Sequence, residues 1–509
     1  MANRGQGQEQ RQERWLLRYE GGTINLIPAP APGAEAELVD ETVAVPPRLP
    51  PSISLNPWLK WDPRSRSYRA LAFHYPRLLR LLKEEGLQIE DQVLKPLELQ
   101  LQDQADLKLK LKLKAPLEAL RPYQREALER WLSGGGQGVV VLPTGAGKTH
   151  LALGAIALLG CAAFIVVPTL DLVEQWKRML ARAFPGLPIG ELTGERKEVE
   201  PLTVATYDSA YIHADSLGNR FPLVVFDEVH HLPAPGYRHI AEFFASPYRL
   251  GLTATYERED QLHEVLPELL GGKVFELGPD ELTGTYLAPY ILERIYVELT
   301  PEEQAAYERA WGTFSRYLKR RRLTLRSPRD FEKLVLRSGS DPEAWEAVRA
   351  RHRAVQIAFN ARAKLEELRR LLRRHREGGD RLIIFTRFNE LVYRISEEFF
   401  IPAITHRTDR AERAQILEGF RRGEYQAIVS SQVLDEGVDV PEANVGIILS
   451  GTGSSREFLQ RLGRLLRPRE GKKAILYEII ARGTGEERTA SRRKRTIRKG
   501  KRGGRAGKG

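Results

Sequence analysis

The run Pro143–Thr149 constrains the fold most strongly, because it lies between a strand-like segment and a helix-like segment. It reads Pro-Thr-Gly-Ala-Gly-Lys-Thr, after the apolar Val139–Leu142 and before the apolar Leu151–Leu159. A strand, a glycine loop and a helix in this order predict a phosphate-binding loop, in which backbone N–H groups and the positive end of the helix dipole hold an anion. The sequence therefore predicts a parallel α/β sheet that binds a nucleotide at this loop.

The side chains of this loop have separate predicted roles. Gly145 and Gly147 allow backbone N–H groups to close around the anion, Lys148 reaches the β- and γ-phosphates, and Thr149 holds Mg²⁺. The longer phosphate-loop pattern requires glycine at the position of Leu142, so the chain meets only the shorter Pro-Thr-Gly-x-Gly-Lys-Thr form. A structural glycine turn is the alternative for the loop taken alone.

Length and composition bound the class of protein. At 509 residues the chain is too long for one core, so about three domains are expected. No apolar run approaches the roughly 18 residues of a membrane span and the N-terminus is polar, so we expect no membrane association and a cytoplasmic, in a prokaryote nucleoid-associated, location. The single cysteine, Cys161, excludes an internal disulfide and is expected to lie in an inert core.

The net charge of +12 is concentrated at one end of the chain. Residues 483–509 contain eleven Lys and Arg residues against Glu486 and Glu487, which gives this segment a net charge of +9. It lacks core-forming residues, so we expect a disordered tail that binds phosphate backbones without sequence preference. A purely solubilising tail is an equally good interpretation.

The first hundred or so residues predict a small α+β domain without visible chemistry. Its expected elements are a hairpin over Trp15–Ile27, a strand over Tyr68–His74, a helix over Pro76–Glu85 and a second, leucine-rich hairpin over Leu97–Leu113. Four lysines, Lys108, Lys110, Lys112 and Lys114, share one face of that second hairpin. They suit a DNA-facing strip, but a solvated edge that discourages aggregation is the interpretation we favour.

Two carboxylates, Asp227 and Glu228, follow the buried strand-like run Leu223–Phe226. Open parallel sheets place their ligands at this end of a strand. We expect Asp227 to complete the Mg²⁺ shell and Glu228 to orient and deprotonate the attacking water. An ordinary helix N-cap is the alternative for the pair alone, and the phosphate loop upstream favours catalysis. Thr253 and Thr255, in and after the next strand-like run, are expected to hydrogen-bond back to the carboxylates.

A second α/β unit follows without a phosphate loop. Its strand-like runs are Arg381–Phe388, Gln426–Ser431 and Val445–Ser450. It ends in a helix-like run on which Gln460, Arg464 and Arg467 share nearly one face, because they are spaced four and three residues apart. Arginines so placed can act as fingers on a γ-phosphate that the other domain holds. An ordinary basic surface is the alternative.

Gln124 lies at the start of an amphipathic helix just before the phosphate loop. Its amide carries a donor and an acceptor, which bidentate recognition of an adenine edge requires.

In their order, these motifs resemble those of a superfamily-2 helicase over about residues 118–482. They are Gln124, the phosphate loop, Val-Pro-Thr-Leu, Asp-Glu-Val-His, Leu-Thr-Ala-Thr, Ile-Phe-Thr-Arg, Asp-Glu-Gly-Val-Asp and Gln-Arg-Leu-Gly-Arg-Leu-Leu-Arg. The chain resembles the XPB branch in particular, because Arg258-Glu259-Asp260 follows the Leu-Thr-Ala-Thr motif and Ser430–Val445 matches the fifth motif of that branch. The resemblance implies an ATP- and Mg²⁺-dependent DNA translocase with 3′ to 5′ helicase activity, which opens duplex DNA in nucleotide excision repair or transcription-linked repair.

The resemblance also implies a domain plan. An N-terminal α+β domain of the damage-recognition type would span residues 1–117, and two tandem RecA-like parallel-sheet domains would span 118–285 and 286–482. The second would carry a helical thumb-like insertion at about 300–353, and the basic tail would span 483–509. In the insertion, the run Ser315–Arg326 has six basic residues, no acid and Tyr317 among them, which suits phosphate gripping.

By the same resemblance, individual positions receive roles. The expected ATP site is Gln124, Thr144, Gly145, Gly147, Lys148, Thr149, Asp227 and Asp439, with Mg²⁺ at Thr149 and Asp227. The expected catalytic residues are Glu228, Gln460, Arg464 and Arg467. The expected DNA contacts are Thr169, Thr206, Arg258, Glu259, Asp260, Ser431, Lys319, Arg320 and Arg321, and Gly437 is an expected tight-turn position.

The expected partners are DNA, single-stranded or at duplex junctions, and a nuclease of the repair pathway. Two alternatives stay open. Helicase core motifs contact the sugar-phosphate backbone, so an RNA helicase is one. The other is a nucleotide-gated scaffold that opens DNA for a nuclease without processive unwinding.

Overall fold

The computed structural model describes residues 14–28, 46–95, 97, 120–258, 260–282, 290–325, 328–431, 443–450, 474–488 and 490. These residues form three sheets within two compact units. The first unit comprises the described residues within 1–140, 149–253 and 264–275, and the second comprises those within 141–148, 254–263 and 276–509. Among the helices of these ranges, none combines the length and apolarity needed to cross a bilayer. Because residues 98–119 and 283–289 lie outside these ranges, the domain boundaries after residues 117 and 285 stay predictions.

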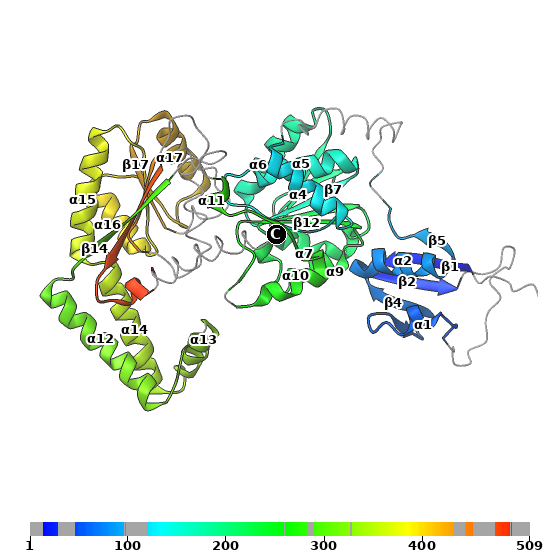
Figure 1. Ribbon diagram of the computed structural model, residues 1–509, viewed down its shortest axis with the longest axis horizontal. Helices are drawn as coiled ribbons and strands as arrows, with labels where there is room; N and C mark the ends of the chain where they lie inside the picture. The colour runs from blue at the N-terminus through cyan, green and yellow to red at the C-terminus, as the bar shows by residue number, and fades with distance from the viewer. Residues whose placement is uncertain are drawn as a thin grey trace, which may run out of the picture. The chain divides into compact units, whose positions relative to one another are not determined.

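A five-stranded sheet in the order β3-β4-β2-β1-β5 forms the N-terminal domain (Figure 1). Its elements are β1 (Arg14–Glu20), β2 (Thr23–Pro28), α1 (Pro51–Ser54), β3 (Lys60–Asp62), β4 (Ser67–Leu71), η1 (Ala72–His74), α2 (Tyr75–Glu84) and β5 (Gln88–Gln92). Trp15, Leu17, Ile24 and Leu26 alternate along the first hairpin and are fully buried, as the period of a half-buried strand requires. The first hairpin and the helix α2 are therefore confirmed.

The strand predicted over Tyr68–His74 ends at Leu71, and the last three residues form the 3₁₀ turn η1. The last bond of the strand pair runs from Ala72 N–H to Gly22 O (2.9 Å). Beyond it the chain turns into α2, whose first turn contains Pro76, a residue suited to the start of a helix. The predicted leucine-rich hairpin lies outside the described residues, apart from Leu97.

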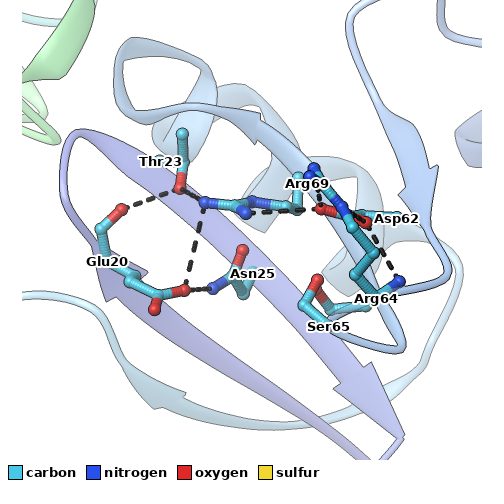
Figure 2. A network of polar contacts seen from close by, with 8 residues as sticks. Glu20, Thr23, Asn25, Asp62, Arg64, Ser65 and Arg69 are labelled. Atoms are coloured by element: carbon cyan, nitrogen blue, oxygen red, sulfur yellow. Dashed lines mark hydrogen bonds and ion pairs between the residues drawn. The ribbon is translucent and has the colours of Figure 1, made fainter.

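A polar network covers one face of the hairpin and joins β2, β3 and β4 (Figure 2). The Arg69 guanidinium donates to Thr23 Oγ1 (2.9 Å) and to Asp62 Oδ2 (3.4 Å). The Asp62 carboxylate also accepts from Arg64 Nε and Nη2, each at 3.1 Å, and the hydrogen bond from Arg64 holds the pKa of Asp62 down to about 2. The Arg64 side chain is 88% exposed, so its ion pair with Asp62 adds little stability.

The N-terminal domain packs against the following sheet within the first unit. The Tyr19 hydroxyl donates to Asp215 O (2.7 Å) with Phe243 O at 3.1 Å, and burial raises the pKa of Tyr19. Asn219 Nδ2 donates to Val93 O at 3.1 Å. Gly22 has φ +83°, and a Cβ there would lie 2.5 Å from the Phe243 ring, so this turn needs glycine for its conformation and for the contact.

His74 makes this packing sensitive to pH. It is 9% exposed and stacks on Trp58 at 4.5 Å, and burial, together with the charges of Arg77 and Arg249, lowers its pKa to about 4. The folded state favours neutral His74. The contribution of His74 to the free energy of unfolding is therefore fully present above the unfolded pKa of about 6.5, and it is lost as the pH falls towards 4.

We expect the free energy of unfolding of the first unit to fall by about 2 kcal/mol between pH 7.5 and pH 5. Denaturant titrations followed by tryptophan fluorescence at both pH values measure it. His74→Phe retains the stacking on Trp58 without a titrating group, so its stability should change much less over the same interval. Equal pH dependence in the two proteins would contradict this role of His74.

The eight-stranded sheet has the order β13-β6-β12-β11-β7-β10-β8-β9. The strands are β6 (Gln137–Val141), β7 (Ala163–Val167), β8 (Ile189–Leu192), β9 (Lys197–Glu198), β10 (Leu202–Thr206), β11 (Leu223–Asp227), β12 (Tyr248–Thr253) and β13 (Lys273–Glu276). The pairings from β12 through β11, β7 and β10 to β8 are parallel. Every residue of β7 and β11 is buried, which is typical of central strands with helices on both faces.

α4 (Pro122–Ser133) precedes the first of these strands and α11 (Pro279–Leu282) follows the last. The helical segments between the strands are α5 (Lys148–Leu159), α6 (Leu170–Ala183), α7 (Tyr207–Ile212), α8 (Ala214–Leu217), η2 (Val229–His231), α9 (Arg238–Phe243), η3 (Leu262–Val265) and α10 (Leu266–Leu270). Strands and helices alternate in a RecA-like α/β arrangement. Cys161 is only half-buried after α5, so the expectation that it lies in the core is wrong.

The six-stranded sheet has the order β14-β19-β18-β15-β17-β16, with parallel pairing throughout. Its strands are β14 (Tyr290–Val297), β15 (Leu382–Phe385), β16 (Ala403–Ile404), β17 (Ala427–Ser430), β18 (Val445–Ile448) and β19 (Ala474–Ala481). The three predicted strands of this unit are confirmed as β15, β17 and β18. The helices are α15 (Arg362–Glu377), α16 (Asn389–Phe399) and α17 (Arg410–Arg422). Leucines three and four apart on α15 pack onto the sheet, as expected for an amphipathic helix.

The predicted thumb-like insertion is helical. It consists of α12 (Pro301–Arg320), α13 (Pro328–Arg337) and α14 (Pro342–Phe359), in which α14 packs against both other helices (Figure 1). The N-terminus of α12 carries a capping box, in which Thr300 Oγ1 accepts from Glu303 N–H and Glu303 accepts from Thr300 N–H.

The chain stays folded beyond residue 483, so a disordered tail cannot begin there. Glu486 pairs with Lys364 Nζ at 2.7 Å and also accepts from Ala481 N–H, and the Tyr307 hydroxyl accepts from Gly485 N–H. Lys364 is 1% exposed, and its Nζ also donates to Leu449 O. The charges around Glu486 predict a place in the tail, but Glu486 neutralises a buried cation of the sheet domain. Residues 491–509 lie outside the described part of the chain.

Candidate functional site

The phosphate loop connects β6 to α5. Gly145 and Gly147 have φ of +84° and +76°, conformations that favour glycine and that turn successive N–H groups inward. Lys148 is 9% exposed, and its Nζ lies 3.5 Å from Leu142 O. Among the described residues, none hydrogen-bonds to the buried Thr144 Oγ1. A buried hydroxyl to which no described residue hydrogen-bonds, a lysine and two left-handed glycines at a helix start fit the phosphates of ATP.

The start of α4 supplies the predicted adenine-reading residue. Gln124 is 3% exposed, and its Oε1 accepts from Arg121 N–H at 2.8 Å. The amide oxygen therefore already fixes the helix start. The charge of Arg121 acts on His150 in α5, whose pKa is lowered by burial first and by this charge second. The start of α4 thus lies near the helix that the phosphate loop opens.

Asp227 ends β11 with both carboxylate oxygens held. Trp176 Nε1 donates to Oδ2 at 2.8 Å, and Glu228 N–H donates to Oδ1 at 3.0 Å. The Tyr207 hydroxyl also donates to the main-chain oxygen of Asp227 at 3.1 Å. The side chain is 5% exposed. Its carboxylate therefore has one orientation, which a magnesium ligand requires.

Glu228 adopts the left-handed conformation, with φ +47° and ψ +53°. This backbone is rare for a residue other than glycine, asparagine or aspartate and costs roughly 1–3 kcal/mol, and such outliers gather at functional sites. No side-chain cap bond forms at the following 3₁₀ turn η2, although Glu228 is its N-cap residue. The interpretation of Glu228 as an ordinary helix cap therefore loses its basis.

Thr253 joins this group through a histidine. His230 Nδ1 lies 3.2 Å from Thr253 Oγ1 and 3.4 Å from Glu228 Oε2, and His230 is 1% exposed. The sequence predicted bonds from Thr253 to the carboxylates, and His230 lies in contact with both. The chain therefore connects the acidic motif of β11 with the end of β12.

The predicted DNA contacts Thr169, Thr206 and Ser431 lie at strand ends. Thr169 caps α6 by accepting from Leu172 N–H at 3.3 Å, and Thr206 caps α7 by accepting from Ser209 N–H at 3.3 Å. Both are half-buried, at the carboxyl ends of β7 and β10. Ser431 follows β17 and is 5% exposed. Two helix N-termini at one sheet edge can hold backbone phosphates.

Arg258 and Asp260 form a bidentate ion pair. The guanidinium donates to the two carboxylate oxygens at 2.9 and 2.6 Å, and the Asp260 carboxylate also accepts from Leu262 N–H. The arginine is therefore held in one orientation by its neighbour. Glu259, the middle residue of the motif, lies outside the described residues.

The basic residues of the thumb are partly neutralised within it. Arg320 and Arg321 each lie 3.3 Å from Glu343, and Arg321 also lies 3.6 Å from Asp341. Lys319 is exposed on the same helix end. Tyr317, which lies among the cations of this run in the sequence, is 3% exposed and packs in the thumb core against residues of α13 and α14.

Besides Glu259, four predicted site residues lie outside the described ranges, namely Asp439, Gln460, Arg464 and Arg467, and so does Gly437. Their roles stay predictions. Sequence reasoning missed the contacts of Trp176 and Tyr207 with Asp227. No pattern could have shown them, because a hydrogen bond between residues on separate elements leaves no spacing signal.

Three family profiles match the chain. That of the xeroderma pigmentosum group B helicase damage recognition domain matches residues 17–93. That of the type III restriction enzyme res subunit matches residues 118–258, and that of the ERCC3/RAD25/XPB C-terminal helicase matches residues 343–500.

Curated proteins are similar over most of the chain. The DNA 3′-5′ translocase XPB2 of Sulfurisphaera tokodaii is 44% identical over 86% of this chain and 96% of its own length. The DNA 3′-5′ helicase XPB of Mycobacterium tuberculosis is 33% identical, over 74% and 63%. The general transcription and DNA repair factor IIH helicase/translocase subunit XPB/SSL2 of Saccharomyces cerevisiae is 28% identical, over 73% and 42%. The chain thus spans nearly all of the first relative, but only 63% and 42% of the other two.

Proposed function

The chain belongs to the XPB family of superfamily-2 DNA helicases and translocases, and we propose on this basis that it uses ATP to move 3′ to 5′ along DNA and to open duplexes during repair. The observation that carries the proposal is the acidic pair after β11. Asp227 is fixed through both oxygens, and Glu228 is held beside it in a strained left-handed conformation. Strain of this kind persists where the surrounding structure holds a reactive group in place.

Nucleotide binding is assigned to the phosphate loop. Backbone N–H groups around Gly145 and Gly147 and the Lys148 ammonium bind the phosphates, while Gln124 recognises the base. Thr149 and Asp227 would hold Mg²⁺, which when bound neutralises charge that develops on the γ-phosphate. Thr144 offers its buried hydroxyl to the same phosphates.

Hydrolysis is assigned to Glu228. Its carboxylate orients a water molecule and accepts the proton as the water attacks the γ-phosphate. His230 contacts both this carboxylate and Thr253, so a change at the carboxylate reaches the loop that follows β12. Arg464 and Arg467, together with Gln460, complete the transition state from the second RecA-like domain, and Asp439 contacts the ribose.

DNA binding is assigned to the strand ends and the thumb. Thr169, Thr206 and Ser431 contact backbone phosphates of the tracked strand. Arg258, Glu259 and Asp260 distort the duplex. On the thumb, Lys319, Arg320 and Arg321 contact the backbone, although the ion pairs of the two arginines with Glu343 must be exchanged for phosphates.

We also propose a nuclease partner on the basis of the family resemblance. On the same basis we propose a cytoplasmic location, which in a prokaryote would be associated with the nucleoid. The two alternatives differ in what they predict. An RNA helicase would respond to RNA at least as strongly as to DNA, and a DNA-opening scaffold would open short duplexes but displace no long strand.

Steady-state ATP hydrolysis without nucleic acid and with single-stranded DNA, duplex DNA and RNA tests the proposal. We expect strong stimulation by DNA and little by RNA. Strand displacement from duplexes with a 3′ or a 5′ tail then reports polarity, and the 3′-tailed substrate should be preferred. Equal or greater stimulation by RNA would overturn the assignment to DNA, and displacement limited to short duplexes would favour the scaffold.

A further inference from the structure

Among the described contacts of α6, the side chain of Trp176 forms a hydrogen bond with the Asp227 carboxylate. Its indole is fully buried, and Nε1 donates to Oδ2 at 2.8 Å. Together with the Glu228 N–H on Oδ1, each carboxylate oxygen receives a fixed donor. A buried tryptophan needs a partner for its N–H, but any carbonyl would satisfy it. Here the partner is the carboxylate proposed to hold Mg²⁺.

The same helix begins at a proposed DNA contact. Thr169 caps the N-terminus of α6, and Trp176 follows about two turns later, roughly 10 Å along the axis. Trp176, Val173 and Leu180 are buried on one face of α6. Because the helix has no break between residues 170 and 183, a movement of its first turn carries the indole with it.

We propose that Trp176 is a positioning residue that orients the Asp227 carboxylate and transmits contact of DNA with the first turn of α6 to the magnesium-binding side of the ATP site. The inference rests on the proposed function, because it takes Asp227 as a metal ligand and Thr169 as a DNA contact. Residues that orient a metal ligand by a hydrogen bond typically change metal affinity by about 10–100-fold when they are removed.

The chain contains a matched control for this role. Trp131 in α4 is also fully buried in the first unit, and its Nε1 donates to Arg249 O at 2.9 Å. Trp131→Phe and Trp176→Phe each remove one buried indole hydrogen bond and leave a similar cavity. Only the second touches Asp227. Trp176→His retains a ring N–H and serves as the rescue variant.

The test measures binding of a fluorescent N-methylanthraniloyl derivative of ADP by anisotropy, in Mg²⁺ and in EDTA, with and without single-stranded oligo-dT. Far-UV circular dichroism first confirms that each variant is folded at the temperature used. For Trp176→Phe we expect the Mg²⁺-dependent gain in affinity to fall by about tenfold, the affinity in EDTA to stay unchanged, and the response of affinity to DNA to disappear. Trp131→Phe should behave as the wild type, and Trp176→His should recover part of the Mg²⁺ dependence.

Several outcomes would overturn the inference. If Trp176→Phe and Trp131→Phe changed binding equally, the indole would only fill space. A Trp176→His variant as impaired as Trp176→Phe would exclude the hydrogen bond as the cause. If Trp176→Phe lost the Mg²⁺ dependence of binding but kept the response to DNA, Trp176 would not transmit DNA contact from α6 to the ATP site. If wild-type binding responded neither to Mg²⁺ nor to DNA, the proposed function itself would fail, so the two failures are distinguishable.

Discussion

Glu228→Gln is expected to lower DNA-stimulated ATP hydrolysis by about 10²–10⁴-fold, the range that a positioned general base contributes. The substitution removes the proton acceptor and little else. Glutamine has the same length, can occupy the same left-handed backbone, and keeps a polar side-chain end beside His230, whose Nδ1 lies 3.4 Å from Glu228 Oε2. The affinity for ATP should therefore stay close to that of the wild type, because the phosphate loop and Asp227 are untouched.

Steady-state hydrolysis and equilibrium nucleotide binding separate these two effects. Glu195→Gln, at an exposed position of the same unit, is the control and should hydrolyse ATP at the wild-type rate. Hydrolysis by Glu228→Gln within a few fold of the wild type would remove Glu228 from catalysis. If nucleotide binding were lost in parallel, the substitution would have changed the shape of the strained turn as well as removing the base. The binding measurement therefore separates loss of the general base from damage to the nucleotide site.

The sequence predicted most of the sheet framework because apolar runs and glycine loops determine it locally. β6, the phosphate loop and α5 follow from Pro143–Thr149 and its flanks, and β15, β17 and β18 follow from uninterrupted apolar runs. Elements that tertiary contacts decide were less predictable. The strand expected through His74 ends at Leu71, and the last hydrogen bond of its pairing runs from Ala72 N–H to Gly22 O. The position of Glu486 was misjudged because its buried partner, Lys364, is more than a hundred residues away.

For the site, sequence order predicted which residue types matter but not what holds them. Asp227 and Glu228 were found from their place after a strand. The left-handed backbone of Glu228 and the indole bond to Asp227 could not be found in this way, because neither has a periodic or local signature. The sequence predicted hydrogen bonds from Thr253 to the carboxylates, whereas the contact described for Thr253 is with His230, whose Nδ1 lies 3.2 Å from Thr253 Oγ1.

The largest expected effect on stability is at Arg249, a cation inside the first unit without a carboxylate among its described partners. It is 1% exposed, and its guanidinium donates to the main-chain oxygens of Ser246 (3.0 Å), Ala241 (2.9 Å), Leu269 (3.1 Å) and Phe244. Burial lowers its pKa to about 9, so it is still charged at neutral pH. One side chain thus satisfies carbonyls from α9, from α10 and from the segment that connects α9 to β12.

Arg249→Met should lower the free energy of unfolding of the first unit by about 3–5 kcal/mol, since each buried carbonyl left without a donor costs about 1–3 kcal/mol. When both partners of a buried ion pair are replaced by apolar residues, little stability is lost. The partners of Arg249 are main-chain carbonyls, which no substitution removes. Arg249→Lys should be nearly as unstable, because one ammonium cannot reach four acceptors. Denaturant titration beside Arg178→Met, an exposed position on α6 where the change should stay within about 0.5 kcal/mol, measures the difference. A loss below about 1 kcal/mol at Arg249 would mean that water replaces the guanidinium at these carbonyls and that α9 and α10 are joined by their apolar contacts instead.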